Sequence, residues 1–266
     1  MMAACFLGEP RMTTHGQTIR PRPLVLDPAR NVQFCANCDA RSHSVCNAID
    51  DKDLARLASS AVQVKIEPGH TFVDEGDTAE SFRNITAGTA KLFKLLPDGR
   101  RQITGFATSG DFLGLAVSHA YSFSAEAVDE VKLCRFSRSK LRILLDDFPA
   151  MEKRLLEVAS NELVAAQDQM LLLGRKTARE RLASFLAARA HAPQHHCPAQ
   201  AGPRGMLRLA LPMTRSDIAD YLGLTIETVS RTLTKLKSEK LIDVPNATEI
   251  IIPNLHALEM VASGGN

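Results

Sequence analysis

The sequence has few aromatic residues and no long apolar run. It contains no tryptophan and two tyrosines, and aromatic residues make up 5% of its 266 positions. No apolar run approaches the roughly 20 residues that a membrane-spanning helix needs. The amino end has a short apolar start, but it lacks both a basic region and a sustained apolar stretch, so we expect no signal peptide. These absences predict a cytoplasmic protein without a membrane segment.

Neither the overall charge nor any catalytic motif indicates a function for the protein. The net charge of +2 is too small to indicate a nucleic-acid partner, so any DNA-binding face must be local. The sequence shows no phosphate-binding glycine loop, no HExxH pattern and no nucleophile–base constellation, which argues against an enzyme. Hydrophobic residues at 45% suffice for sizeable cores, and the length indicates about two domains.

Residues 218–236 predict two short helices joined at Gly223. Apolar residues recur at helical spacing on both sides of this glycine, which suits a tight turn. Thr225 is placed to cap the second helix. The outward face of that helix carries groups that bind base edges and phosphates, namely Glu227, Thr228, Ser230, Arg231, Thr234 and Lys235. This is the pattern of a helix-turn-helix with the second helix as the major-groove reader; an ordinary two-helix core with a polar face is the alternative.

Three of the six cysteines lie close together in a polar stretch. Cys35 and Cys38 form a C-x-x-C pair, and Cys46 follows seven intervening residues later. In a reducing cytosol this spacing favours thiolate ligation of a metal over a disulfide, although small buried core cysteines are the alternative. Three ligands leave a metal site incomplete. The candidates for a fourth ligand are Cys134, Cys5, Cys197 and His43.

The middle of the chain predicts an antiparallel β-roll. From residue 62 to about residue 136, turn signals alternate with short strand-like runs, such as residues 90–96 and 102–106. Residues 124–136 should supply the closing strands, and Cys134 lies there. A fold that places Cys134 beside the amino-terminal loop would complete a four-thiolate site. We expect residues 1–34 to form a flexible arm and residues 35–147 to form the cysteine loop and roll.

Residues 148–174 predict one long helix with two stripes. The first stripe, through Leu156, Leu163 and Met170, is apolar and follows a heptad. The second is half apolar and consists of Val158, Asn161, Ala165, Asp168 and Leu172. Such a helix should lie between its own roll and a second subunit. We assign the weaker stripe to the dimer interface, where Asp168 would face its twin and oppose pairing, so that Asp168→Ala should dimerise in air; a merely solvated Asp168 is the alternative.

The remaining residues, 175–266, predict a winged helix-turn-helix domain, with a short strand at 207–211 and a hairpin wing over 241–252. The predicted fold is therefore α+β: an amino-terminal antiparallel roll, a long dimerisation helix and a winged helix-turn-helix. This order resembles the superfamily of the cyclic-AMP receptor protein and the fumarate-nitrate reduction regulator, FNR, over about residues 35–255. The strings that carry the resemblance are QITGF at 102–106, GDFLGL at 110–115, QDQMLLLGRK at 167–176 and YLGLTIETVSR at 221–231.

The resemblance carries several expectations about ligands. Cyclic-nucleotide binders of this superfamily carry an Arg-Ser pair for the phosphate, whereas here Phe123 stands in place of the arginine, so no cyclic nucleotide is expected. The cysteines look like the FNR branch, whose members hold an oxygen-labile [4Fe-4S] cluster; Cys35, Cys38, Cys46 and Cys134 would be its ligands. The gap from Cys38 to Cys46 is longer than in the best-known FNR pattern and is similar to FnrN-type and FnrL-type relatives. Structural zinc, or a thiol-redox switch between Cys35 and Cys38, is the alternative.

The resemblance also implies the partners. Glu227, Ser230 and Arg231 match the E-x-x-S-R of FNR-type readers, with Thr225 and Thr228 beside them on the same helix. The implied target is double-stranded DNA with a TTGAT-n4-ATCAA palindrome, bound by a homodimer that the cluster promotes at low oxygen to control anaerobic genes. By the same resemblance, the surface around residues 102–114 would contact RNA polymerase.

Overall fold

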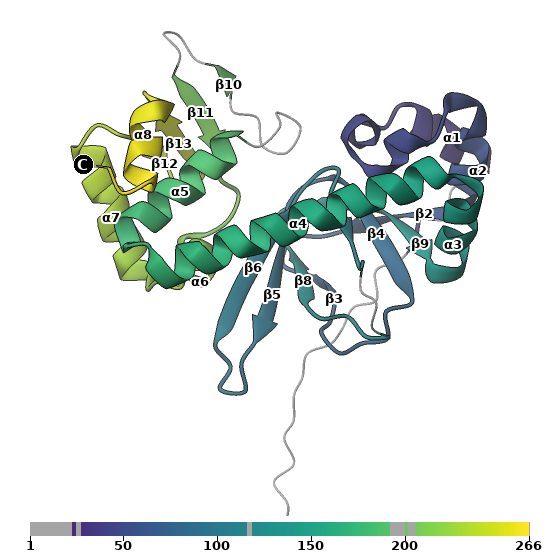
Figure 1. Cartoon of the computed structure of the whole chain (residues 1–266), viewed down its shortest axis with the longest axis horizontal. Coiled ribbons are helices and arrows are strands. Elements are labelled where there is room, and N and C mark those ends of the chain that lie inside the picture. The colour runs from purple at the N-terminus through teal and green to yellow at the C-terminus, as the bar shows by residue number, and fades with distance from the viewer. Residues whose placement is uncertain (1–22, 25–27, 116–118, 192–199, 202–205, 266) are drawn as a thin grey trace, which may run out of the picture.

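The computed structural model describes residues 23–24, 28–115, 119–191, 200–201 and 206–265. Three parts follow one another along the chain: a β-roll with a helical segment before it, the long helix α4 (Pro149–Arg175), and a winged helix-turn-helix domain. Figure 1 shows α4 running from the roll to the carboxy-terminal domain. The predicted α+β fold and the order of its parts are confirmed.

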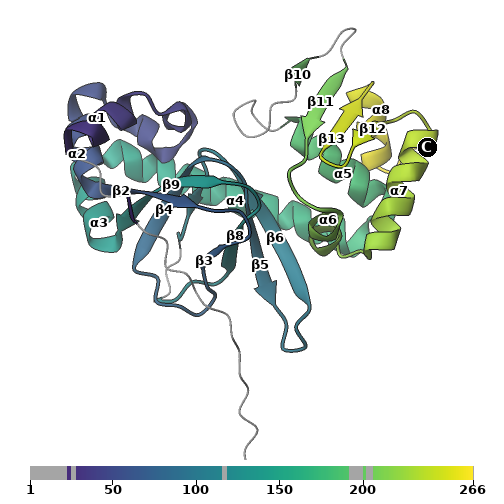
Figure 2. The ribbon, with the colours of Figure 1, turned by 180° about the vertical axis from the view of Figure 1, so that it is seen from behind.

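Two antiparallel sheets form the roll, and both are visible in Figure 2. Their strand orders are β1-β2-β9-β4-β7 and β3-β8-β5-β6. The strands are β1 (Pro23–Leu24), β2 (Ala61–Ile66), β3 (Thr71–Val73), β4 (Ser81–Ala87), β5 (Ala90–Leu95), β6 (Arg101–Ala107), β7 (Phe112–Leu113), β8 (Ser124–Ala127) and β9 (Val131–Ser137). Alternate residues point to opposite faces of a strand, and one face of each sheet contributes to a shared core around Val64, Ile85 and Leu133.

The segment before the roll is helical. It comprises α1 (Pro28–Ala36), three short 3₁₀ helices, η1 (Asp39–His43), η2 (Val45–Ala48) and η3 (Asp51–Asp53), and α2 (Leu54–Ser60). The expectation of a flexible arm up to residue 34 is wrong for residues 28–34. Val32 and Phe34 pack against the cluster of buried residues that contains the cysteines, and this apolar contact stabilises α1. Residues 1–22 and 25–27 of the predicted arm lie outside the described residues.

The long helix α4 spans both halves of the molecule. It begins with Pro149 in its first turn, a position that tolerates the missing N–H, and it agrees with the predicted 148–174 to one residue at each end. Met151 and Leu155 are buried in the cysteine-side core, and Leu172 is buried in the core of the carboxy-terminal domain. Sequence analysis missed the helix before it, α3 (Arg138–Asp147), whose Leu141 and Leu144 enter the same cysteine-side core.

The carboxy-terminal domain contains the predicted reader helices and wing. Its elements are α5 (Ala178–His191), β10 (Gln200–Ala201), β11 (Leu207–Ala210), α6 (Arg215–Leu222), α7 (Ile226–Ser238), β12 (Asp243–Asn246), β13 (Glu249–Ile252) and α8 (Leu255–Ala262). The four strands form one antiparallel sheet in the order β10-β11-β13-β12. Within the described ranges, the helices are all too short or too polar to cross a membrane.

Candidate functional site

Four cysteines line one small cavity between the amino-terminal segment and the roll. Cys35 lies in α1, Cys38 directly precedes η1, and Cys46 lies in η2. Cys134 comes from β9 and completes the set on the cavity wall. The fold therefore brings Cys134 beside the three amino-terminal cysteines, although they are 88 or more positions apart in the chain. Their role as metal ligands stays a prediction.

The four thiols share a buried environment. Burial raises the pKa of Cys35 to about 11 and that of Cys46 to about 12. It also raises the pKa of Cys38, and it raises that of Cys134 well above the usual range of a thiol. For Cys134, the negative charges of the other three cysteines add to this effect, so the four sulfur atoms lie within electrostatic reach of one another. Binding of a metal centre must therefore displace protons from these thiols.

The chemistry of the cavity wall fits a sulfur-ligated centre. Its described lining residues include no His, Asp or Glu, and soft thiolates suit iron–sulfur clusters and zinc. Within the described ranges, no three His, Cys, Asp or Glu side chains are grouped so as to hold a single metal ion. The cavity measures about 20 Å³, which is room for about one water molecule. The four thiols therefore suit a cluster as ligands. Because the cavity is so small, the cysteine segment must move when a cluster enters.

Of the other candidates for a fourth ligand, His43 is the one that the structure describes, and it is not on this wall. His43 lines a larger, separate groove between the amino-terminal segment and the wing, and its Nε2 lies 3.4 Å from the hydroxyl of Ser109. Cys5 and Cys197 lie outside the described residues. Of the four candidates named from the sequence, Cys134 is thus the one that the described structure places beside the other three cysteines.

The reader helix has the geometry expected from its sequence. Gly223 joins α6 to α7 with φ +61°, a left-handed conformation that glycine adopts without strain. The Thr225 hydroxyl accepts a hydrogen bond from the backbone N–H of Thr228 at 3.2 Å and caps α7. The polar face is open: Glu227, Ser230, Arg231, Thr234 and Lys235 are exposed, and Thr228 is half-buried.

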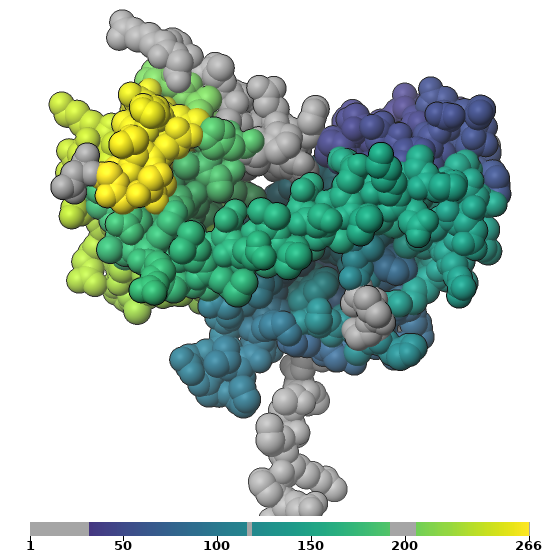
Figure 3. All heavy atoms as spheres, viewed as in Figure 1, coloured from purple at the N-terminus to yellow at the C-terminus, as the bar shows by residue number. Residues whose placement is uncertain are grey.

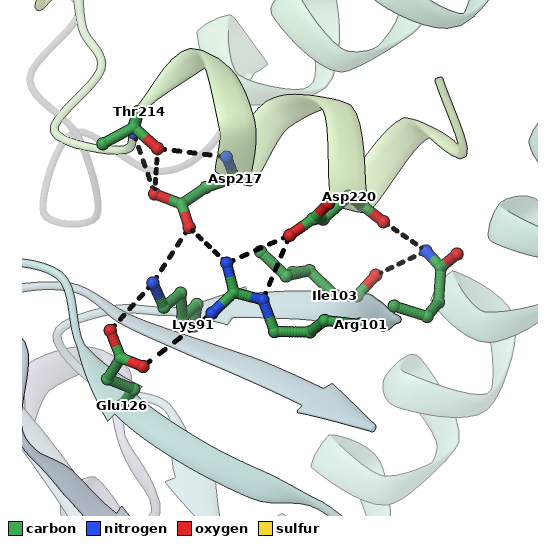
Figure 4. A network of polar contacts seen from close by, with 8 residues as sticks. Lys91, Arg101, Ile103, Glu126, Thr214, Asp217 and Asp220 are labelled. Atoms are coloured by element: carbon green, nitrogen blue, oxygen red, sulfur yellow. Dashed lines mark hydrogen bonds and ion pairs between the residues drawn. The ribbon is translucent and has the colours of Figure 1, made fainter. Parts of the chain in front are cut away.

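An ionic cluster joins the roll to the first helix of the reader (Figure 4). The Nζ atom of Lys91 lies 2.9 Å from Asp217 Oδ1 and 2.8 Å from Glu126 Oε1. Arg101 contacts the same Asp217 oxygen at 3.4 Å and Asp220 Oδ2 at 3.0 Å. Lys91 and Asp217 are buried, at 7% and 3% exposure. This roll–reader cluster fixes α6 on the roll, and no pattern in the sequence indicated it because its members lie more than 100 positions apart.

Neutral contacts extend the roll–reader cluster. The Gln102 side-chain amide donates to the carbonyl of Asp220 at 2.7 Å. The ring of Tyr221 lies 5.4 Å from that of Phe106 in the roll and 5.5 Å from that of Phe185 in α5. Part of the surface over residues 102–114 that we expected to contact RNA polymerase is therefore occupied by the chain's own reader domain.

Part of the stripe of α4 that was predicted to form the dimer interface packs against the protein's own chain. Among the predicted interface residues, Leu172 is 7% exposed in the core of the carboxy-terminal domain, and Val158 packs against the cysteine-side core. Ala165 lines a cavity against the roll but is itself exposed, as are Asn161 and Asp168. Two of the five residues thus pack against their own chain, because the two ends of this stripe meet the cysteine-side core and the carboxy-terminal core.

The most exposed apolar residues of α4 belong to the other stripe, and Val164 and Leu171, outside both stripes, are also exposed. Leu156, Leu163 and Met170 are 68%, 62% and 66% exposed. Figure 3 shows α4 uncovered along the face of the molecule. At 100° per residue, Asp168 lies more than 100° around the helix from Leu163 and Met170. In a dimer that pairs through this stripe, Asp168 would not face its twin, and the place of Asp168 in the dimer stays a prediction.

These features define a class of protein: a sensory roll joined by a long helix to a DNA-reading winged helix. Comparisons with known proteins agree. Residues 63–148 match the family model of the cyclic nucleotide-binding domain, and residues 180–261 match that of the Crp-like helix-turn-helix domain. The chain is 41% identical over 219 residues to the nitrogen fixation regulation protein FixK of Bradyrhizobium diazoefficiens, covering 82% of this chain and 89% of that protein.

Further relatives support the same family. The chain is 34% identical to the transcriptional activator protein FnrL of Cereibacter sphaeroides, covering 84% of this chain and 90% of that protein. The solved structure of FixK2 from Bradyrhizobium japonicum superimposes with a TM-score of 0.68 at 34% identity, covering 76% of this chain and 96% of that one. The chain belongs to the CRP/FNR family, in its FNR branch, and is a DNA-binding transcription regulator of the FNR/FixK type. Members of the family are dimeric regulators, not enzymes.

Proposed function

We propose that this regulator senses oxygen through a [4Fe-4S] cluster held by Cys35, Cys38, Cys46 and Cys134. The observation that carries the proposal is the shared cavity, in which four thiols from four separate elements meet without any carboxylate or imidazole among the described lining residues. Four thiolates are the usual ligands of such a cluster. When bound, the cluster supplies a centre that reacts with oxygen and is lost.

The protein's own contacts transmit the state of the cysteine segment. η2, which carries Cys46, packs against α4, and Met151 and Leu155 of α4 lie in the same core as the cysteines. The opposite end of α4 contributes Leu172 to the core of the reader domain. Movement of residues 35–46 therefore acts on one end of a helix whose other end is built into the reader domain.

DNA binding is proposed to use α7 in the major groove of a TTGAT-n4-ATCAA palindrome. Arg231 is suited to donate two hydrogen bonds to a guanine, and Glu227 to accept from a cytosine amino group. Ser230, Thr225 and Thr228 complete the polar face. The two readers of a homodimer would be paired through the open stripe of α4, and contact with RNA polymerase would use roll surface that the reader domain leaves uncovered.

The cavity between the roll and α4 argues against a cyclic nucleotide. It measures about 490 Å³ and is lined by Phe123, Asp111 and Glu162, with no lysine or arginine among its described residues. A phosphate would meet carboxylates there without a cation to balance it. The proposed function therefore needs no nucleotide effector.

The test is an absorption spectrum with iron and sulfide analysis of protein purified without oxygen and then exposed to air. We expect a brown protein with about four iron and four sulfide per chain, which bleaches in air. Cys134→Ser should be colourless, and Cys197→Ser serves as the matched control that keeps the cluster. A colourless parent with one zinc per chain, or a parent whose DNA binding responds to a thiol oxidant without iron, would replace the cluster by one of the alternatives.

A further inference from the structure

Two residues on the wall of the cysteine cavity each carry a buried polar atom that has no partner among the described residues. The Asn84 side chain is 2% exposed, and its Oδ1 has no hydrogen-bond partner in the part of the chain that the structure describes. The Nε atom of Arg41 is likewise buried and without a partner there. Both residues lie on the wall of the cavity that the four cysteines line. Buried polar groups are nearly always satisfied, so two such atoms on one wall indicate a missing hydrogen-bonding partner inside the cavity.

The fold holds Asn84 next to a cysteine. Asn84 of β4 is directly opposite Cys134 of β9 in an antiparallel pair. Residues in this relation project their side chains from the same face of the sheet, with Cβ atoms roughly 5 Å apart. The pairing of β4 with β9 therefore places the Asn84 side chain beside that of Cys134.

Arg41 lies in η1, between Cys38 and Cys46 in the sequence. One terminal nitrogen donates to Asp51 Oδ1 at 2.6 Å, and the other donates to the carbonyl of Ile49 at 2.6 Å. These bonds occupy the two terminal nitrogens, and the buried Nε–H has no partner among the described residues. The guanidinium lies on the same cavity wall as all four cysteines.

The partner that Arg41 lacks must be an acceptor, because Nε of a guanidinium donates only, whereas Asn84 Oδ1 is an acceptor and lacks a donor. Neutral thiols are weak acceptors, whereas thiolates and sulfides accept hydrogen bonds and do not donate them. The amide of Asn84 can meet both conditions: its oxygen accepts from a thiol, and a half-turn of the amide presents its N–H₂ to a thiolate. An aspartate at this position would add a negative charge beside the sulfurs, and an aliphatic residue would donate nothing.

We propose that Asn84 and Arg41 donate N–H hydrogen bonds to the sulfur atoms of the bound centre and thereby set how readily it is oxidised. The proposal rests on the proposed [4Fe-4S] cluster and deepens it by naming the positioning residues of its environment. Hydrogen bonds to sulfur withdraw electron density from a cluster and raise its reduction potential. Loss of either donor should therefore lower the potential and speed the loss of the cluster in air.

The experiment compares Asn84→Leu with the parent and with Asn47→Leu. Leucine has the branched shape of asparagine with a larger volume and lacks the amide, and Asn47 is an exposed asparagine next to Cys46, so it makes a matched control. The readouts are iron and sulfide content, reduction potential and the rate of bleaching in air. We expect Asn84→Leu to load the parent's iron content, to bleach at least threefold faster and to have a more negative potential, with Asn47→Leu unchanged.

A second measurement separates this role from a merely structural one. Without the cluster, Asn84→Leu should be at least as heat-stable as the parent, because it removes a buried atom that has no partner. With the cluster, it should be the less stable of the two. A purely structural asparagine would lower the stability of both forms and overturn the proposal.

Arg41→Lys provides an independent variant, since it keeps the charge and removes the Nε donor. It should bleach faster than the parent as well. A loaded Asn84→Leu and a loaded Arg41→Lys that both match the parent in potential and bleaching rate would refute the hydrogen bonds while leaving the cluster intact. A parent that contains no iron would instead overturn the proposed function at the first spectrum, and this inference with it.

Discussion

The open stripe of α4 leads to a quantitative prediction for Leu163→Ala. Leu163 is 62% exposed in the single chain, and full burial of a leucine side chain contributes about 1.5–3 kcal/mol. Burial of the exposed part in two subunits thus contributes about 2–4 kcal/mol, of which the remaining alanine methyl keeps a share. We expect the dimer to lose about 1–3 kcal/mol, which raises the dimer dissociation constant roughly 5- to 150-fold.

Sedimentation equilibrium over a range of concentrations measures this constant. Ile143→Ala is the matched control, because Ile143 is an aliphatic side chain of 59% exposure on α3 and not on α4. Asp168→Ala should change the constant less than Leu163→Ala does. If Asp168→Ala tightened the dimer tenfold or more while Leu163→Ala left it unaltered, the assignment of the stripes from burial would be refuted.

Three other outcomes follow from the reader domain. Arg231→Ala should cost about 1–3 kcal/mol of affinity for the palindrome and relax the preference at its guanine, as measured by fluorescence anisotropy with matched and mismatched duplexes; equal losses on both duplexes would contradict this. Gly223→Ala should lower the free energy of unfolding by about 1–2 kcal/mol in denaturant titrations, because φ is +61° and the new Cβ would lie 3.2 Å from Leu173. Asp217→Asn should lower it by about 3 kcal/mol at pH 7, because it breaks a buried ion pair. Burial raises the pKa of Asp217, but hydrogen bonds from Thr214 and Lys91 outweigh this and hold it below its ordinary value. The Asp217 contribution is therefore present above pH about 4 and is lost as pH falls through the lowered pKa, so parent and variant should converge in acid; a gap that stays constant would count against the ion pair.

Short sequence patterns predicted the elements whose conformation depends on residues close together in the chain. Gly223 and Thr225 fix the turn and cap of the reader by their own backbone preferences, and the structure shows both. The cysteine spacing predicted a thiolate site with Cys134 as one of four candidates for the fourth ligand, and the resemblance to FNR selected it. Helix α1 was missed because its stability comes from contacts of Val32 and Phe34 with a core assembled from distant parts of the chain.

Periodicity also failed to decide which face of α4 is covered. Both stripes recur at helical spacing, and a heptad does not state whether its partner is a second subunit or the same chain. The outcome depended on Leu172 and Val158, which meet cores at opposite ends of the helix. Likewise, Asn84 and Arg41 have no motif, and their importance depends on the wall that they share with the cysteines.

The roll–reader cluster limits how this protein can be recombined with its relatives. A chimera that joins this roll to another regulator's reader domain would bury Lys91 and Arg101 against whatever side chains replace Asp217 and Asp220. Unless the donor supplies acids at both positions, two cations would lose carboxylate partners in a poorly hydrated contact. A domain exchange should therefore not use the end of α4 as its junction. Strands β5 and β6 and the start of α6 should be transferred together.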